Sequence, residues 1–173
     1  GQKARIEQQH AVLDGIHLMQ TWSGDARLDS LITSKSAQSN PEIANLIGQH
    51  LEICPNTQVH WVDEILWESI SELENAPQIM GLLQLELTKP NSKTITGDVL
   101  ILDAIQDAGN VGTILRTALA TDFKQIVCTT RTAHIWSPKV LRAAMGAHRH
   151  LHFYEGWSVN DVASNIESSL LAT

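Results

Sequence analysis

The sequence DVLILDAIQDAGNVGTILRTALA, residues 98–120, contains the pattern that decides the fold class. Residues 98–105 form an apolar run typical of a central parallel strand. Residues 111–120 have the apolar spacing of a helix, which we expect to begin at Val111. A turn rich in glycine separates them, and one arginine, Arg116, lies on the helix. This order predicts a strand that leads through a glycine turn into a helix, as in α/β proteins.

The turn between the two elements has the composition of a ligand site. Free N–H groups and the helix dipole make the start of a helix suitable for an anion or a polar ligand. Gly109 and Gly112 permit close approach and unusual backbone angles. Arg116 lies four residues after Gly112, so it is expected to point over the same helical turn and bind phosphate there. The alternative is an ordinary glycine-rich connection with a surface arginine.

Strand and helix patterns alternate along the rest of the chain, which favours an α/β fold with a largely parallel sheet. Strands are expected at residues 11–15, 28–34, 58–63, 78–87, 98–105, 125–130 and 150–155. Further helices are expected at residues 41–51, 64–74, 138–146 and 159–173, the last running to Thr173. Their expected caps are Asn40, Asp63, Ser137 and Ser158.

The polar segment Thr88–Gly97 contains Pro90 and lacks apolar periodicity, so we expect a linker there. It divides the chain into residues 1–87 and 98–173. Neither GxGxxG nor GxxxxGK[ST] occurs at the glycine turn, which argues against a dinucleotide-binding domain or a P-loop.

Composition indicates an ordinary globular protein, with 43% hydrophobic and 18% charged residues. No apolar run approaches the roughly 18 residues of a membrane span. The two cysteines lack CxxC spacing, so we expect a reduced, cytoplasmic protein with no membrane association.

Charge is distributed unevenly. The net charge is −7, yet residues 116–149 hold six Lys or Arg and one acid. A basic region of this kind is compatible with a polyanion site or with a solvated helix face. His148, His150 and His152 alternate as on one strand face, but no cysteine or carboxylate completes a ligand set, so no metal is expected.

The segment LDAIQDAGNVGTILRTALA, residues 102–120, resembles the first motif of the SpoU (TrmH-like) RNA ribose 2′-O-methyltransferases. Ala108 replaces the proline of the family pattern. The segment SPKVLRAAMGAHRHLHF resembles the family segment that ends in Gly-Ala, here Gly146 and Ala147. The motif match covers Asp107, Asn110, Gly112, Ile114, Arg116, Thr117 and Ala118.

Residues 3–22 and 59–83 resemble the start and the end of the small substrate-binding domain of that family, which is similar to ribosomal protein L30e. The resemblance implies an L30e-like RNA substrate-binding domain over residues 1–87. It also implies that residues 98–173 are the first part of a SPOUT-type parallel-sheet domain. The second and third family motifs, which form most of the cofactor pocket and the C-terminal knot, have no counterpart here. We therefore expect this piece alone to be inactive and to bind cofactor weakly or not at all.

The resemblance implies methyl transfer from S-adenosylmethionine to a ribose 2′-hydroxyl of rRNA or tRNA by a homodimer. Arg116 is the implied catalytic residue. It would hold phosphate and stabilise charge on the 2′-oxygen, since a guanidinium stays protonated and is a poor base. Asn110 would orient Arg116 or the ribose, or it simply caps the helix. Lys139, Arg142 and Arg149 would contact the RNA backbone, or they are solvated.

Two other functions fit the sequence. One is a non-enzymatic RNA-binding module, and the other is a nucleotide-binding α/β domain.

Overall fold

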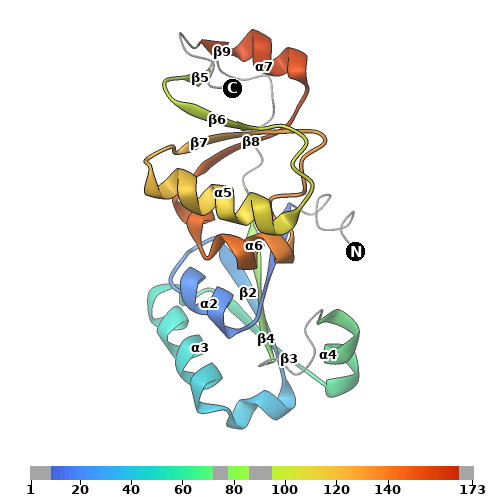
Figure 1. Ribbon diagram of the computed structural model, residues 1–173. Coiled ribbons are helices and arrows are strands. Elements are labelled where there is room, and N and C mark those ends of the chain that lie inside the picture. Colours follow the sequence, from blue (N-terminus) through green and yellow to red (C-terminus); the bar gives the residue numbers. More distant parts are fainter. Residues whose placement is uncertain (1–8, 72–77, 86–94, 168–173) are drawn as a thin grey trace. The chain divides into compact units, whose positions relative to one another are not determined.

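The computed structural model describes residues 9–71, 78–85 and 95–167, and the chain divides into two compact units (Figure 1). The first unit comprises Gly1–Leu85 with Trp136–Pro138, and the second comprises Glu86–Ile135 with Lys139–Thr173. Most of the expected linker, residues 88–94, lies outside the described residues. Ile95 and Thr96, which that linker would include, form a short strand. The domain boundary therefore stays a prediction.

The first unit is built on a four-stranded mixed sheet with the order β1-β4-β2-β3. Strand β4 is antiparallel to both of its neighbours, and β3 is parallel to β2. The expectation of a largely parallel sheet is therefore wrong for this unit, because β4 runs against the others. The strands are β1 (His10–Asp14), β2 (Leu28–Ser34), β3 (Gln58–Val62) and β4 (Ile79–Gln84).

The helices of the first unit begin where side chains cap them. Asn40 accepts hydrogen bonds from the N–H groups of Glu42 and Ile43 at the start of α3. Asp63 accepts one from Leu66 at the start of α4, which ends at Ile70, earlier than expected. The sequence did not predict α2 or the 3₁₀ helix η1. The bounds are α2 (Ile16–Trp22), η1 (Lys35–Ser39), α3 (Pro41–Ile53) and α4 (Glu64–Ile70).

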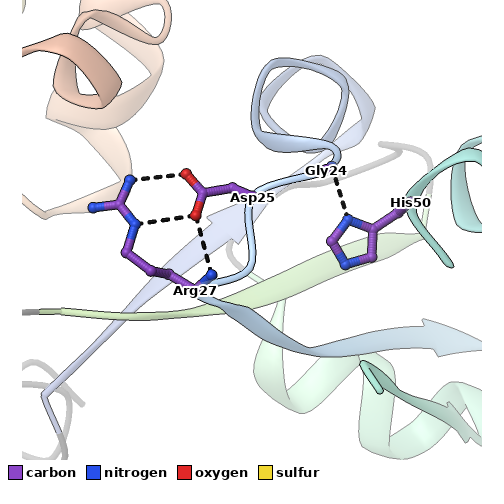
Figure 2. A network of polar contacts seen from close by, with 4 residues as sticks. All are labelled: Gly24, Asp25, Arg27 and His50. Carbon is purple, nitrogen blue, oxygen red and sulfur yellow. Dashed lines mark hydrogen bonds and ion pairs between the residues drawn. The ribbon is translucent and has the colours of Figure 1, made fainter. Parts of the chain in front are cut away.

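Hydrogen bonds join the last turns of α3 to the loop that follows α2 (Figure 2). The N–H of Gly24 donates to Nδ1 of His50 at 3.0 Å, and Nε2 of His50 lies 2.9 Å from the hydroxyl of Thr57. Arg27 donates two hydrogen bonds to Asp25 through its guanidinium. Burial lowers the pKa of His50, so the neutral ring joins the two loops.

The second unit contains a wholly parallel sheet with the order β6-β7-β8. A small separate sheet pairs β5 with β9, also in parallel. The strands are β5 (Ile95–Thr96), β6 (Val99–Leu102), β7 (Gln125–Thr129), β8 (His152–Trp157) and β9 (Ile166–Glu167). The helices are α5 (Ala108–Ala120), α6 (Pro138–Ala144), η2 (Ala147–His150) and α7 (Val159–Asn165).

Two sequence expectations about the second unit are wrong. The last helix ends at Asn165 rather than running to Thr173, because Ile166 turns into β9 and packs against the core around Trp157. Residues 168–173 lie outside the described part. His148 and His150 lie in η2 and His152 lies in β8, so the three do not share a strand face.

Each unit contains one of the two cysteines. Cys54 is half-buried at the end of α3, and Cys128 is buried in β7. Burial raises the pKa of the Cys128 thiol to about 12, and the nearby Glu155 carboxylate adds to this effect. Cys128 is therefore a neutral core thiol.

Candidate functional site

The helix that carries Arg116 begins earlier than the sequence predicts. Helix α5 starts at Ala108, and Asp107 is its N-cap. The carboxylate of Asp107 accepts a 2.7 Å hydrogen bond from the N–H of Asn110. The predicted glycine turn is therefore mostly the first turn of the helix, and the predicted start at Val111 is wrong because the Asp107 side chain closes the turn before it.

This cap changes what the start of α5 can bind. The Asp107 carboxylate places a negative charge at the positive end of the helix dipole and uses one of the free N–H groups. An anion at this helix end would therefore meet the Asp107 carboxylate, and the expected site for an anion or polar ligand stays a prediction. The interpretation that Asn110 is merely the cap is wrong, because Asp107 has that role and Asn110 is exposed within the helix.

The two glycines of the motif have ordinary helical backbone angles rather than the unusual angles expected of them. Gly112 is needed for packing instead. A Cβ at this position would lie 2.3 Å from the Cβ of Ala143 and 2.8 Å from the backbone nitrogen of Ala144, both on α6. The prediction that Gly112 permits a close approach is thus confirmed, and the group that approaches it is helix α6.

The connection from β6 to α5 is held by groups that the sequence analysis missed. Ala104 has a positive φ of 56°, and its N–H donates to the Thr129 hydroxyl at 3.3 Å. That hydroxyl donates to Asp103 at 2.8 Å, and Arg131 pairs with the same carboxylate at 3.6 Å. One signal in the sequence could have found them. Asp103 follows β6 and Thr129 ends β7, and the carboxyl ends of neighbouring parallel strands lie at the same edge of a sheet.

Arg116 lies on the exposed face of α5, and no described residue hydrogen-bonds or ion-pairs its guanidinium. Asn110 and Thr117 are exposed on the same helix. Arg116 is six positions after Asn110, which places the two about 120° apart around the helix axis. No hydrogen bond joins the two among the residues described, so the structure does not support Asn110 as the group that orients Arg116.

The other predicted RNA contacts lie on and after α6. Lys139 and Arg149 are exposed, whereas Arg142 is half-buried. Nη1 of Arg142 is buried and has no hydrogen-bond partner in the described part of the chain. The alternative that Arg142 is a solvated surface cation therefore does not fit the structure. Gly146, with a φ of 85°, follows α6 and starts η2.

Arg116 and Arg142 lie on two helices that are in contact, α5 and α6. Arg116 is one helical turn after Gly112, on nearly the same side of α5. Arg142 is the residue before Ala143, which receives Gly112. The two arginines are therefore carried by the two helices that pack together at Gly112.

The histidines do not form a metal site. Within residues 9–71, 78–85 and 95–167, no group of three or more histidine, cysteine or acidic side chains could hold a metal ion. His148 is buried, and its Nε2–H donates to the carbonyl of Ile135 at 2.8 Å. Burial lowers the pKa of His148 to about 4, which fits a neutral core histidine.

The described residues also contain no helix that is both long and apolar enough to span a membrane.

Comparison with known proteins gives the site its context. The model of the SpoU rRNA Methylase family matches residues 98–173, which include the whole α5 motif. The match covers less than half of the chain. The matched segment contains Arg116, Asn110, Arg142 and the glycine that packs α5 on α6.

Curated relatives extend the likeness. The 23S rRNA (guanosine(2553)-2'-O)-methyltransferase RlmP of Bacillus subtilis is 35% identical over 95 residues, 54% of this chain and 37% of that protein. The mitochondrial rRNA methyltransferase 3B of Danio rerio is 27% identical and covers 94% of this chain and 36% of that protein. The chain therefore spans little more than a third of the length of these two relatives.

Solved structures show the same fold. An AdoMet-bound rRNA methyltransferase from Sinorhizobium meliloti covers 94% of this chain and 60% of that chain, with a TM-score of 0.68 and 19% identity. The SpoU methyltransferase AviRb from Streptomyces viridochromogenes covers the same shares at a TM-score of 0.67 and 17% identity. The α/β fold class and the family resemblance are thus confirmed, while the individual site residues stay predictions.

Proposed function

We propose that the protein containing this chain transfers a methyl group from S-adenosylmethionine to a ribose 2′-hydroxyl of rRNA or tRNA. The SpoU match over residues 98–173 and the RNA methyltransferases among its relatives support the reaction class. The observation that carries the proposal is Arg116, an exposed guanidinium that no described residue pairs, on the family's first motif.

The geometry supports a specific role for Arg116. A guanidinium can bind a phosphate with two parallel hydrogen bonds and keeps its charge at every relevant pH. Held beside the target nucleotide, it would stabilise negative charge that develops on the 2′-oxygen. Arg142, which lies on α6 next to Ala143, is proposed as a second contact to the RNA backbone, and Lys139 and Arg149 as outer contacts.

The described residues do not by themselves fit S-adenosylmethionine. Asp107 is engaged in capping α5, and Asp103 is engaged with Thr129 and Arg131, so these carboxylates at the edge of the sheet are already used. We assign no residue of this chain to the cofactor. Dimer formation is a proposal that rests on the family resemblance. Cytoplasmic location is one that rests on the cysteine spacing, and the absence of a metal is one that rests on the lack of a ligand set around the histidines.

Changing Arg116 to alanine in the complete enzyme tests the role. We expect methyl transfer to fall at least about a hundredfold, about 3 kcal/mol in the barrier, because the charge-stabilising group is lost. Arg116→Lys should recover little, since a point charge does not replace the two-pronged contact. Transfer of labelled methyl groups to substrate RNA is the measurement.

Lys124→Ala is the matched control, because Lys124 is an exposed cation of the same unit that pairs with Asp122. It should leave turnover near normal. Normal turnover in Arg116→Ala would refute the assignment. If the unaltered protein binds RNA through Arg116 but transfers no methyl group, it is an RNA-binding module.

A further inference from the structure

The helical elements around Arg116 carry cationic side chains and no carboxylates. Helices α5 and α6 and the 3₁₀ helix η2 contain no Asp or Glu. Helix α6 packs against α5 at Gly112 (Figure 1), and η2 also contacts α5. The cations of these three elements are Arg116, Lys139, Arg142 and Arg149.

The acids on either side of α5 in the chain are already engaged. Asp107 caps the start of α5, and Asp122, two residues after its end, pairs with Lys124 at 2.9 Å. Residues 123–154 contain five Lys or Arg and no Asp or Glu. An anionic partner at α6 and η2 therefore meets cations without a carboxylate from the same segment, and phosphate is an anion that arginine binds well.

Met145 differs from its neighbours because it places an apolar side chain on a strained backbone. It follows α6, is 69% exposed, and has a φ of 47°, in the left-handed region. This region is unfavourable for a residue with a Cβ, and strain of this kind collects at functional sites. Packing within the chain does not offset the strain, since most of the side chain is exposed. Within residues 138–150, Met145 is the one large apolar side chain that is exposed.

Backbone hydrogen bonds hold Met145 between two turns that carry arginines. Its N–H donates to the carbonyl of Arg142 at 3.3 Å, and the N–H of Arg149 donates to the carbonyl of Gly146 at 3.1 Å. One apolar group between cationic turns matches the chemistry of a nucleotide, which carries a phosphate beside the apolar face of its base. Methionine is among the side chains that proteins insert against bases.

We propose that the thioether side chain of Met145 contacts the face of an unstacked base in single-stranded RNA, whose phosphates bind the cations of α5, α6 and η2. The RNA must be single-stranded at this point, because base faces in a duplex are covered by their stacked neighbours. The proposal rests on the proposed function and narrows its substrate to RNA with an accessible base at this turn.

Two other anionic partners fit the observations less well. An anionic membrane holds a protein through several apolar side chains that enter the lipid layer, and residues 138–150 expose one. An acidic protein would need a cluster of apolar side chains for the buried centre of its interface, which the same residues do not offer. A single apolar side chain with several cations favours the single strand.

Met145→Gly tests the base contact, because glycine removes the side chain and relaxes the left-handed backbone. The probes are an oligoadenylate of about 12 nucleotides and a ribose-phosphate chain of equal length without bases. Their binding to the intact chain is measured by fluorescence anisotropy. We expect the variant to bind oligoadenylate about fivefold more weakly and the base-free chain equally well, since one apolar contact is lost. Its thermal unfolding midpoint should not fall, whereas a purely structural role of Met145 predicts a decrease.

Two matched variants separate the apolar contact from charge. Met145→Leu keeps an apolar side chain of similar volume and should bind oligoadenylate within about twofold of the unaltered chain. Lys139→Gln should weaken the binding of both probes equally. It should also lower the slope of log affinity against log salt concentration by about 0.7, because one phosphate contact is lost. Met145→Gly should leave that slope unchanged.

The competing results are distinct. Equal affinity of Met145→Gly and the unaltered chain for oligoadenylate would overturn the proposal, as would an equal loss with the base-free chain. So would a failure of the unaltered chain to bind oligoadenylate, or tighter binding of polyglutamate or phosphatidylserine vesicles. None of these measurements involves methyl transfer, so the proposed reaction can fail while the base contact holds.

Discussion

Helices α3 and α5 share a design and differ in what a glycine does inside them. Both are thirteen residues long, and the side chain of the preceding residue caps each of them. Gly48 in α3 faces open space, with no atom within 4 Å of where a Cβ would be. Gly112 in α5 is pressed against the backbone of α6. The same residue in the same kind of helix is thus dispensable in one place and required in the other.

Gly112→Ala should give the largest effect on stability. The new Cβ would lie 2.3 Å from the Cβ of Ala143 and 2.7 Å from its backbone carbon, so α5 and α6 must separate. We expect a loss of about 3 kcal/mol in the free energy of unfolding of the second unit, measured by urea denaturation. Adding Ala143→Gly should restore only part, because the backbone contact remains. A loss below about 0.5 kcal/mol would show that the two helices can shift freely.

The pH dependence of stability extends the comparison to the histidines, His50 near the end of α3 and His148 after α6. His148 has a pKa of about 4 in the folded chain and about 6.5 when unfolded. Because the folded value is depressed, its contribution is full above pH 6.5 and is lost as the pH falls toward 4. Unfolding free energy should drop by about 2 kcal/mol from this group between pH 7 and pH 5.

His148→Asn isolates that contribution, since the variant lacks the titrating ring. Urea unfolding of both proteins at several pH values is the measurement. His50 changes stability in the same direction in both, so it cancels in the difference. An identical pH slope for the two proteins would contradict the prediction.

Removing the N-cap side chain should have the same effect on stability in α3 and in α5. Asn40→Ala removes the acceptor for two N–H groups at the start of α3, and Asp107→Ala removes the acceptor for Asn110 at the start of α5. Each change should cost about 1 kcal/mol in unfolding free energy, because capped N–H groups lose their partner. Thermal unfolding followed by circular dichroism checks this. A much larger cost for Asp107 would mean that it holds more than the helix start.

Gly48→Ala should give the smallest change and the opposite sign. Nothing opposes a Cβ there, and alanine favours helix over glycine, so stability should rise by about 0.5–1 kcal/mol. A rise in the unfolding midpoint of the first unit is the expected observation. A decrease at Gly48 would remove the contrast with Gly112.

Much of the fold could be predicted from local signals, because caps act within a few residues. Asn40, Asp63 and Ser158 were predicted to start helices, and each accepts the expected backbone hydrogen bond. Strand β2 has the predicted bounds. What could not be predicted depends on distant contacts, as when Ile166 leaves the last helix to pack near Trp157.

The candidate site follows the same division. The position of Arg116 on the helix after the glycine turn was predicted from the local sequence, and the structure confirms it. The start of α5 was misplaced because two glycines look like a turn in sequence, and only the neighbouring helix α6 shows why Gly112 is there. The links among Ala104, Thr129 and Asp103 join different strands, so no local pattern revealed them.

The placement of the two cysteines provides a built-in chemical reporter. Thiol reagents attack the thiolate, and Cys128 is both buried in β7 and kept protonated by its raised pKa. Its alkylation must wait until the packing over that face of the sheet opens, whereas half-buried Cys54 lies in the first unit. Timed alkylation followed by mass spectrometry would therefore measure the opening rate of the second unit alone, in the intact chain and without an introduced label.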